Sequence, residues 1–178
     1  MSDWHLYHAI FKEVREEGDT YFMSCDVIFD YETIVEKESL LIPYLVKNSN
    51  SFSVLPIIKR PYSQMPPDFN YNAQFSPFAI KYLFDRKDWP VPYLSHLKHQ
   101  IMVLCRCCKE SRNMLASLPN LFLPLEHGLP EDICFYRDRK AWFVTISHEK
   151  MASAYNVTNT DITFFKAHNI RFSNASAE

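Results

Sequence analysis

Residues 129–150 read LPEDICFYRDRKAWFVTISHEK, and this stretch holds the densest strand pattern in the chain. Two runs rich in aromatic and β-branched residues, 133–136 (ICFY) and 141–146 (AWFVTI), flank the polar residues 137–140 (RDRK). Apolar runs of this kind, separated by a short polar segment, are typical of a β-hairpin. We therefore predict a hairpin here, at the centre of a sheet.

Other strand patterns have the spacing of further hairpins. Residues 20–30 predict a strand, and the apolar runs 40–46 and 52–58 predict a second hairpin. Pro43 and Pro56 lie inside these two runs, and proline cannot donate a hydrogen bond to a neighbouring strand, so both strands should be edges, or bulged or broken at the proline. Because strands cluster and do not alternate regularly with helices, we predict an α+β fold with a mostly antiparallel sheet built from hairpins.

Helical periodicity predicts what packs against this sheet. The longest expected helix covers 93–118, and its apolar stripe includes Ile101, Leu104 and Cys105. A last helix should begin at Thr158 or Thr160. The shorter helices are expected at residues 4–17, 76–86, 148–155 and 158–167. The predicted architecture is thus a sheet covered by one long amphipathic helix and several shorter helices.

The N-terminal segment 4–17 is strongly two-sided when placed on a helix. At 100° per residue its apolar side holds Trp4, Leu6, Tyr7, Ile10, Phe11 and Val14. Its polar side holds His5, His8, Lys12, Glu13, Arg15 and Glu16. Gly18 follows as a natural stop for the helix.

The length of 178 residues suggests one globular domain. We expect it to cover residues 1–172, with a small polar tail at 173–178 that frays. The hydrophobic share of 47% is enough for a substantial core.

Charge and glycine content argue against several classes of ligand. The net charge is −2, and no run of Lys and Arg is longer than two residues, so nucleic acid is not expected as a partner. Gly18 and Gly128 are the only glycines, whereas phosphate-binding loops need glycine so that the backbone can approach the anion. No cofactor is predicted.

Membrane association and export are not expected either. The N-terminus lacks the basic and apolar regions of a signal peptide, and the longest apolar run, residues 101–105, is too short to span a bilayer. An odd number of cysteines, five, is typical of reduced thiols. These features favour a cytoplasmic protein.

Two patterns resemble metal sites without completing one. Cys105 and Cys108 have the C-x₂-C spacing of zinc ligands but no matching second pair, so we interpret them as core residues. The pairs His5/His8 and His96/His99 would each share a helix face, yet both lie on polar faces. No metal site is predicted, although metal binding by the histidines remains an alternative.

Residues 147–149 (Ser-His-Glu) end the second strand of the central hairpin. Ser147 is expected to cap a short helix, with Glu149 near its positive end. His148 has no such structural role. One hypothesis is therefore a hydrolase or transferase acting on a small ligand, with His148 as acid or base and Glu131 or Asp132 nearby.

The leading hypothesis is protein binding. Residues 60–75 form a long irregular segment rich in aromatic residues, which are enriched at interface hot spots. The candidate binding residues are Tyr62, Phe69, Tyr71 and Phe75. We therefore predict a small protein that binds another protein or itself, in an inhibitor, immunity or adaptor-type role.

Overall fold

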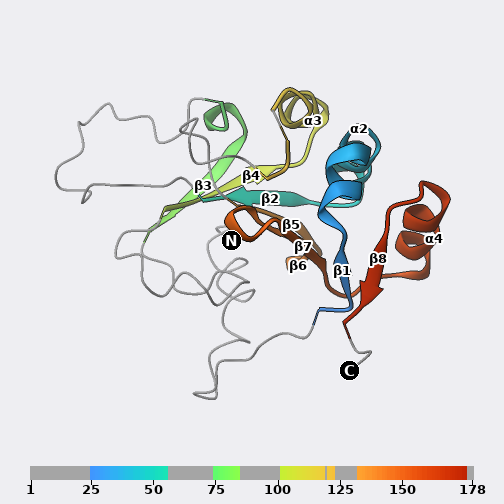
Figure 1. Ribbon diagram of the computed structural model, residues 1–178. Helices are drawn as coiled ribbons and strands as arrows, with labels where there is room; N and C mark the ends of the chain where they lie inside the picture. The colour runs from blue at the N-terminus through green and yellow to red at the C-terminus, as the bar shows by residue number, and fades with distance from the viewer. Residues whose placement is uncertain (1–24, 56–73, 85–100, 119, 123–131, 176–178) are drawn as a thin grey trace, which may run out of the picture.

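The structure is a computed structural model that describes residues 25–55, 74–84, 101–118, 120–122 and 132–175. These residues form one sheet of eight strands and three α-helices (Figure 1). Every strand pair is antiparallel. The predicted α+β class with an antiparallel sheet is therefore confirmed.

The sheet has the order β3-β4-β2-β5-β6-β7-β1-β8. Its strands are β1 (Val27–Phe29), β2 (Ser51–Val54), β3 (Ala79–Phe84), β4 (Ile101–Arg106), β5 (Ile133–Arg137), β6 (Lys140–Ile146), β7 (Met151–Ala154) and β8 (Phe172–Asn174). The hairpin predicted from the opening stretch is β5 and β6, and these two strands occupy the middle of the order. Its position at the centre of the sheet is confirmed.

The β5–β6 hairpin closes through a two-residue turn. Asp138 and Arg139 have φ angles of 48° and 70°, the left-handed conformation that matches the twist of a tight hairpin. This conformation is uncommon for residues other than glycine, asparagine and aspartate. The Asn50 side chain supports it, because its Oδ1 accepts a hydrogen bond of 2.7 Å from the backbone N–H of Asp138.

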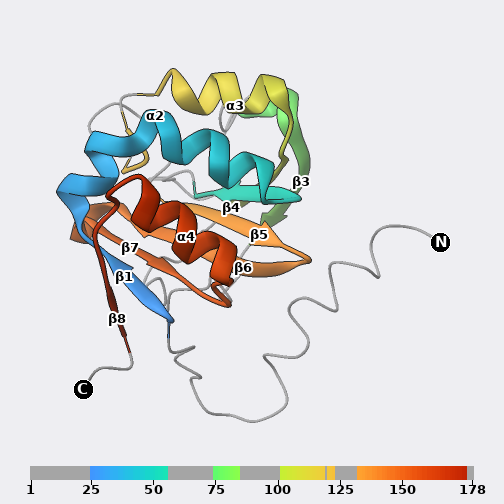
Figure 2. The ribbon, with the colours of Figure 1, turned by 90° about the vertical axis from the view of Figure 1, so that its right-hand side faces the viewer.

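The three described helices lie on the same face of the sheet (Figures 1 and 2). They are α2 (Tyr31–Lys47), α3 (Lys109–Ala116) and α4 (Asn159–Ala167). Alternate residues of each strand point toward them, so the main core forms between the two layers. In β5, for example, Ile133 and Phe135 belong to this core, whereas Cys134 and Tyr136 belong to a second cluster on the opposite face.

Helix α2 occupies the place where a hairpin strand was predicted. The apolar run 40–46 is not a strand, because the helix begins after Asp30, whose carboxylate accepts a 2.9 Å hydrogen bond from the N–H of Thr33. Ile34, Leu41 and Leu45 are all fully buried and recur at helical spacing. That helix carries Pro43 in its interior. The second strand of the predicted hairpin is real but pairs elsewhere, since β2 lies between β4 and β5.

The long helix predicted at 93–118 is wrong at residues 101–106 and correct at residues 109–116. Residues 101–106 form β4, and the helix α3 that follows covers eight residues. Val103 and Cys105 face the helices, whereas Met102 and Leu104 face the opposite side, and all four are buried. A strand buried on both faces has a continuous apolar sequence, which periodicity alone cannot distinguish from a buried helix.

Two predicted helix starts lead only to single turns. Ser76–Phe78 is a 3₁₀ turn that enters β3, in place of a helix over 76–86. Ser147–Glu149 is likewise a 3₁₀ turn that enters β7, and Ser147 is its first residue, so the cap position falls on Ile146. In both places pairing with a neighbouring strand overrides the local helical signal.

The C-terminal region follows the prediction more closely. Helix α4 ends at Ala167 as predicted, and it begins after Thr158, whose hydroxyl and backbone exchange hydrogen bonds with Asp161 in a capping box. The polar tail begins later than predicted, because Ser173 and Asn174 pair with β1 in β8. Within the described part of the strand predicted at 20–30, which begins at residue 25, residues 27–29 form β1.

Several predicted features lie outside the described residues. They are the helix at 4–17, the aromatic segment up to residue 73, and residues 93–100 with His96 and His99.

Candidate functional site

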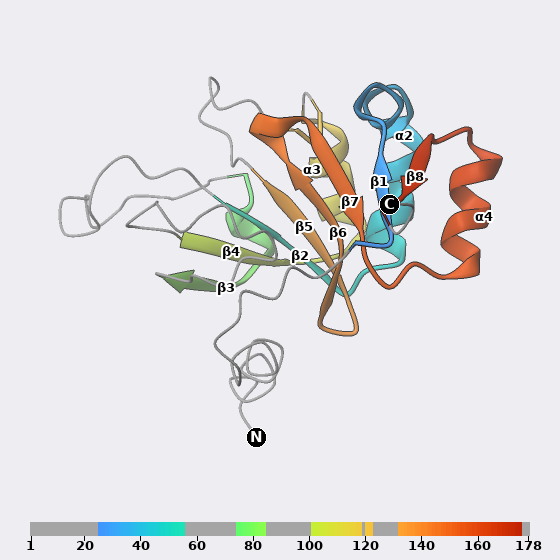
Figure 3. The ribbon, with the colours of Figure 1, turned by 60° about the horizontal axis from the view of Figure 1, so that its bottom comes forward.

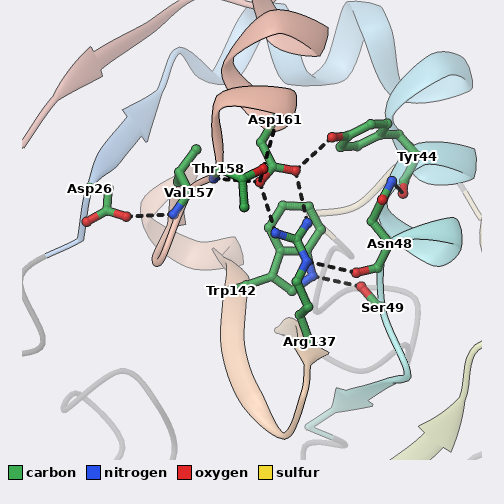
Figure 4. Close-up of polar contacts among 9 residues, drawn as sticks. All are labelled: Asp26, Tyr44, Asn48, Ser49, Arg137, Trp142, Val157, Thr158 and Asp161. Atoms are coloured by element: carbon green, nitrogen blue, oxygen red, sulfur yellow. Dashed lines mark hydrogen bonds and ion pairs between the residues drawn. The ribbon is translucent and has the colours of Figure 1, made fainter.

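A buried ion pair joins the central hairpin to helix α4. The Arg137 guanidinium donates two hydrogen bonds of 2.9 Å to the Asp161 carboxylate, one to each oxygen (Figure 4). The Asp161 side chain is 1% exposed and that of Arg137 is 23% exposed. Such bidentate geometry is the strongest form of side-chain ion pair.

Residues of three elements complete this polar cluster (Figure 4). Tyr44 of α2 donates a 2.7 Å hydrogen bond to Asp161, and the Thr158 hydroxyl donates another of 2.6 Å. Arg137 also donates to the backbone carbonyl of Asn48 at 3.1 Å, and its guanidinium lies 3.9 Å from the centre of the Trp142 ring. The cluster therefore fastens α2 and α4 to the end of β5.

The protonation states fit a permanent ion pair. Burial alone would raise the pKa of Asp161, but hydrogen bonds from Arg137, Thr158 and Tyr44 outweigh it and lower the pKa to about 2. The hydrogen bond to Asp161 raises the pKa of Arg137. Both Asp161 oxygens accept hydrogen bonds from these donors. We therefore interpret the cluster as structural: it connects α2 and α4 to the sheet.

The predicted catalytic group is only partly visible. Asp132 is 2% exposed, and its Oδ1 accepts a 2.8 Å hydrogen bond from the backbone N–H of Ser147. This contact holds the end of β6 against the start of β5. Glu131 lies outside the described residues, and the described part of His148 is its backbone in the 3₁₀ turn. A joint role for His148, Glu131 and Asp132 stays a prediction.

One predicted binding residue is a core residue. Phe75 is fully buried, and its ring centre lies 6.2 Å from that of Phe52. Its side chain is therefore inaccessible to a partner. Tyr62, Phe69 and Tyr71 lie outside the described residues, so their binding role stays a prediction.

Cys105 and Cys108, the pair with the C-x₂-C spacing, have structural roles. Cys105 is buried, and burial raises the pKa of its thiol to about 12. Cys108 caps α3 by accepting a 3.4 Å hydrogen bond from the N–H of Ser111. All five cysteines are free thiols. No group of three His, Cys, Asp or Glu residues suited to a metal ion occurs within the described ranges.

The outer side of α2 combines acidic and apolar residues. Helical positions 32, 35, 36, 39 and 40 fall on one stripe. This stripe, called the α2 stripe below, consists of Glu32, Val35, Glu36, Ser39 and Leu40, all exposed to solvent. Val35 is 37% exposed and Leu40 is 44% exposed. Together with Ile80 they are the large apolar side chains that the described part of the chain exposes.

A hollow of about 260 Å³ lies at the tip of the central hairpin. It is lined by Asn50, Ser51, Asp138 and Arg139. Ligand pockets are usually larger, from about 300 to 1,000 Å³, and mostly apolar. This hollow is therefore a poor candidate for a small-molecule site.

Comparison with known proteins finds no match. No protein-family model, curated protein or solved structure matches this chain. In the part of the chain that the structure describes, no helix is long and apolar enough to cross a membrane. Neither the α2 stripe nor the Arg137–Asp161 pair follows from the sequence patterns above.

Glu38 is a half-buried carboxyl on the inner side of α2. It accepts a hydrogen bond from the backbone N–H of Leu121, and burial raises its pKa to about 7 in spite of that bond. A raised carboxyl pKa means that the folded state binds more protons than the unfolded state between about pH 4.5 and 7. The stability that this group contributes at low pH is therefore lost as the pH rises through 7.

We expect Glu38→Gln to remove this loss. The variant should gain about 1–2 kcal/mol relative to the wild type between pH 5 and pH 8. Urea unfolding at several pH values measures the difference. Glu32→Gln is the matched control, because it removes a carboxyl from the same helix that is 86% exposed. A Glu38→Gln curve parallel to the wild-type curve would contradict the assignment.

Proposed function

We propose that this protein acts by binding another protein through the α2 stripe. The observation that carries the proposal is the position of Val35 and Leu40, two large apolar side chains exposed on one side of one helix. Scattered exposed apolar residues are ordinary, but here they share a single stripe with two glutamates and a serine. Val35 and Leu40 lie at the two edges of the stripe, with Ser39, Glu32 and Glu36 between them. Protein interfaces commonly combine apolar side chains with polar and charged ones in this way.

The charges of the stripe favour a basic partner. Both of its charged residues are acidic: Glu36 pairs with the adjacent Lys37, and Arg171 approaches Glu32 at 4.0 Å. Exposed ion pairs of this kind contribute little, so a partner's Lys or Arg can replace them at small cost. Opposite charges would also accelerate association at low salt. Such binding suits an inhibitor, immunity or adaptor-type role.

Pairing through a sheet edge fits the structure less well. The outermost described strands are β3 and β8. The β3–β4 register shifts between Ala79 and Lys81, so Ile80 forms a bulge. At the other edge, β8 has three residues. Bulges and short edge strands both discourage the addition of another strand.

The small-ligand enzyme remains the alternative. Its support would be a cavity that joins His148 to Glu131 or Asp132. The contact of Asp132 with Ser147 gives this carboxylate a structural role and does not favour the alternative.

Photocrosslinking in the cells that make the protein tests the proposal. A photoreactive amino acid is placed at Leu40, or at the exposed Thr163 of α4 as the control position. We expect an adduct of one defined mass at position 40 and none above background at position 163. Equal adducts at both positions, or none at position 40, would refute the proposal.

Charge variants then test the basic partner. Glu32→Gln and Glu36→Gln together should strongly reduce the adduct at position 40, because they remove both charges of the α2 stripe. The control is the double variant Asn113→Lys and Ala167→Lys, at exposed positions of α3 and α4. It raises the net charge by the same amount as the two glutamate substitutions. This control should leave the adduct intact. If both double variants reduce the adduct equally, the effect comes from net charge and the α2 stripe is not the interface.

A further inference from the structure

Helix α2 continues through a proline. Pro43 lies in the interior of the helix, which extends beyond it to Lys47. In an α-helix the backbone N–H of each residue donates to the carbonyl four positions earlier, and proline has no N–H. The carbonyl of Ser39 therefore lacks the donor that the helix would otherwise supply. The proline ring also crowds this carbonyl, which tilts away from the helix axis.

This carbonyl belongs to the α2 stripe. Helix α2 lies between α3 and α4 in the helical layer (Figures 2 and 3). Ser39 is exposed, and Pro43, one turn further along the same side, is half-buried. Leu40 shares a peptide bond with the Ser39 carbonyl and is 44% exposed. The freed acceptor therefore lies beside one of the two apolar side chains of the proposed interface.

The charges around the carbonyl favour a positively charged donor. Both charged residues of the α2 stripe are acidic, and Glu36 lies one turn before Ser39. Water can satisfy an exposed carbonyl in the free protein, so only a donor stronger than water gains affinity. Hydrogen bonds from charged donors are about twice as strong as those from neutral ones.

The fold already contains a contact of this kind at the end of the same helix. Asn48 is the C-cap residue of α2, and its backbone carbonyl accepts a 3.1 Å hydrogen bond from the Arg137 guanidinium. A carbonyl of α2 that has no helical donor is thus paired with a cationic side chain. The Ser39 carbonyl offers the same chemistry on the outer side of the helix.

We propose that the carbonyl of Ser39, freed by Pro43, accepts a hydrogen bond from a Lys or Arg side chain of the protein partner. Leu40 would pack against the apolar stem of that side chain. Because it uses the α2 stripe, this contact rests on the proposed function. It adds the group that recognises the partner and the charge of the side chain that is recognised.

Pro43→Ala tests the contact, because alanine restores the backbone N–H and favours the helix. The restored N–H should bind the Ser39 carbonyl and withdraw it from the partner. With the photoreactive amino acid at position 40, we expect the adduct formed in cells to fall about tenfold, the loss of one hydrogen bond from a charged donor. The variant should melt at no lower temperature than the wild type, so unfolding would not explain the loss.

Pro77→Ala is the matched control. Pro77 is exposed near the start of a 3₁₀ turn, where a restored N–H has no helical carbonyl to bind. The adduct at position 40 should therefore be unchanged. Pro43→Gly restores the same N–H as Pro43→Ala and should also lower the adduct, which keeps the test decisive if the alanine variant fails to fold.

Amide hydrogen exchange shows whether the carbonyl is indeed the acceptor. In Pro43→Ala the amide of residue 43 should exchange as slowly as the amides of Tyr44 and Leu45 in the same helix. If the amide of residue 43 exchanges freely, the Ser39 carbonyl does not bind it, and the proposed contact is wrong.

The adduct also identifies the side chain that binds. After digestion with pepsin, mass spectrometry should find Lys or Arg within about four residues of the crosslinked position in the partner peptide, and the one found is the donor. With that residue replaced by methionine, wild type and Pro43→Ala should give equal adducts. If Pro43→Ala still lowers the adduct tenfold, the partner contacts the proline ring and not the carbonyl.

The outcomes separate this contact from the proposed function. No adduct at position 40 of the wild type would refute both. An adduct that Pro43→Ala leaves intact, while the amide of residue 43 is protected, would refute the contact with Ser39 alone. A partner peptide without Lys or Arg near the crosslink would also refute that contact, and the α2 stripe would remain the interface.

Discussion

Replacing Asp161 with alanine is expected to lower the free energy of unfolding by about 3 kcal/mol or more, because it leaves a largely buried guanidinium without its partner. The Asp161 carboxylate also accepts hydrogen bonds from Tyr44 and Thr158, and both donors would lose their acceptor. The loss therefore reaches α2 and α4 together. Urea unfolding followed by circular dichroism measures it.

The double variant separates the ion pair from the rest of the cluster. Arg137→Met combined with Asp161→Ala should cost less than the sum of the two single changes, because no buried charge is left unpaired. Asp138→Asn is the control, since it removes an exposed carboxylate from the same hairpin and keeps a residue suited to the left-handed conformation. Strict additivity of Arg137→Met and Asp161→Ala would show that the two side chains do not interact.

The same ion pair makes the free energy of unfolding depend on pH in the acidic range. Because the folded-state pKa of Asp161 lies near 2, below its ordinary value of 3.8, its contribution is present above about pH 4. It is lost as the pH falls toward 2. The stability difference between the wild type and Asp161→Asn should accordingly shrink over that range, and a constant difference would contradict the lowered pKa.

Replacing Trp142 with alanine is expected to cost about 4 kcal/mol, as for other large aromatic side chains removed from a core. Trp142 is 1% exposed. Its indole N–H donates a 2.8 Å hydrogen bond to the Ser49 hydroxyl, and the Arg137 guanidinium lies over its ring. Thermal unfolding measures the loss of packing, the hydrogen bond and the cation–π contact together.

Trp142→Phe divides these contributions. It retains an aromatic ring for Arg137 and loses the N–H and part of the volume, so it should cost clearly less than Trp142→Ala. Ser49→Ala removes the acceptor alone and should cost about 1–2 kcal/mol. If Trp142→Phe and Trp142→Ala destabilise the protein equally, the hydrogen bond dominates and the ring contributes little.

The polar cluster also positions the proposed interface. Tyr44 and Asn48 connect α2 and its C-terminal cap to the cluster, so the α2 stripe is held on a rigid support. A variant such as Asp161→Asn should therefore weaken photocrosslinking at Leu40 only where it also loosens the fold. Substitutions of Glu32 and Glu36, by contrast, should affect binding without affecting stability.

Local signals predicted some elements correctly. The β5–β6 hairpin has two strand-like runs around four polar residues, and Thr158 supplies a helix cap three residues before an acidic partner. Helix α2 carries a comparable signal, since Ile34, Leu41 and Leu45 recur at helical spacing. The strand prediction fails there because the run 40–46 resembles a strand only when it is separated from the nine residues before it.

Other elements depend on contacts that no local pattern contains. Strand β4 is apolar on both faces because each face is buried, and β7 is a strand because β6 and β1 lie on either side of it. The candidate sites likewise differ in whether local sequence or a long-range contact determines them. The α2 stripe follows once the helix is known, whereas the pairing of Arg137 with Asp161 joins residues 24 positions apart.

The sequence by itself determined the central hairpin and the last helix, because both arise from interactions between near neighbours, and the clustering of its strand patterns predicted the antiparallel α+β class. Only the tertiary structure decided that the run 101–106 is a strand, that Phe75 is a core residue, and that Arg137 and Asp161 meet. Those outcomes depend on burial and pairing between distant segments. Such interactions form only when the chain folds, and they override local propensity where the two conflict.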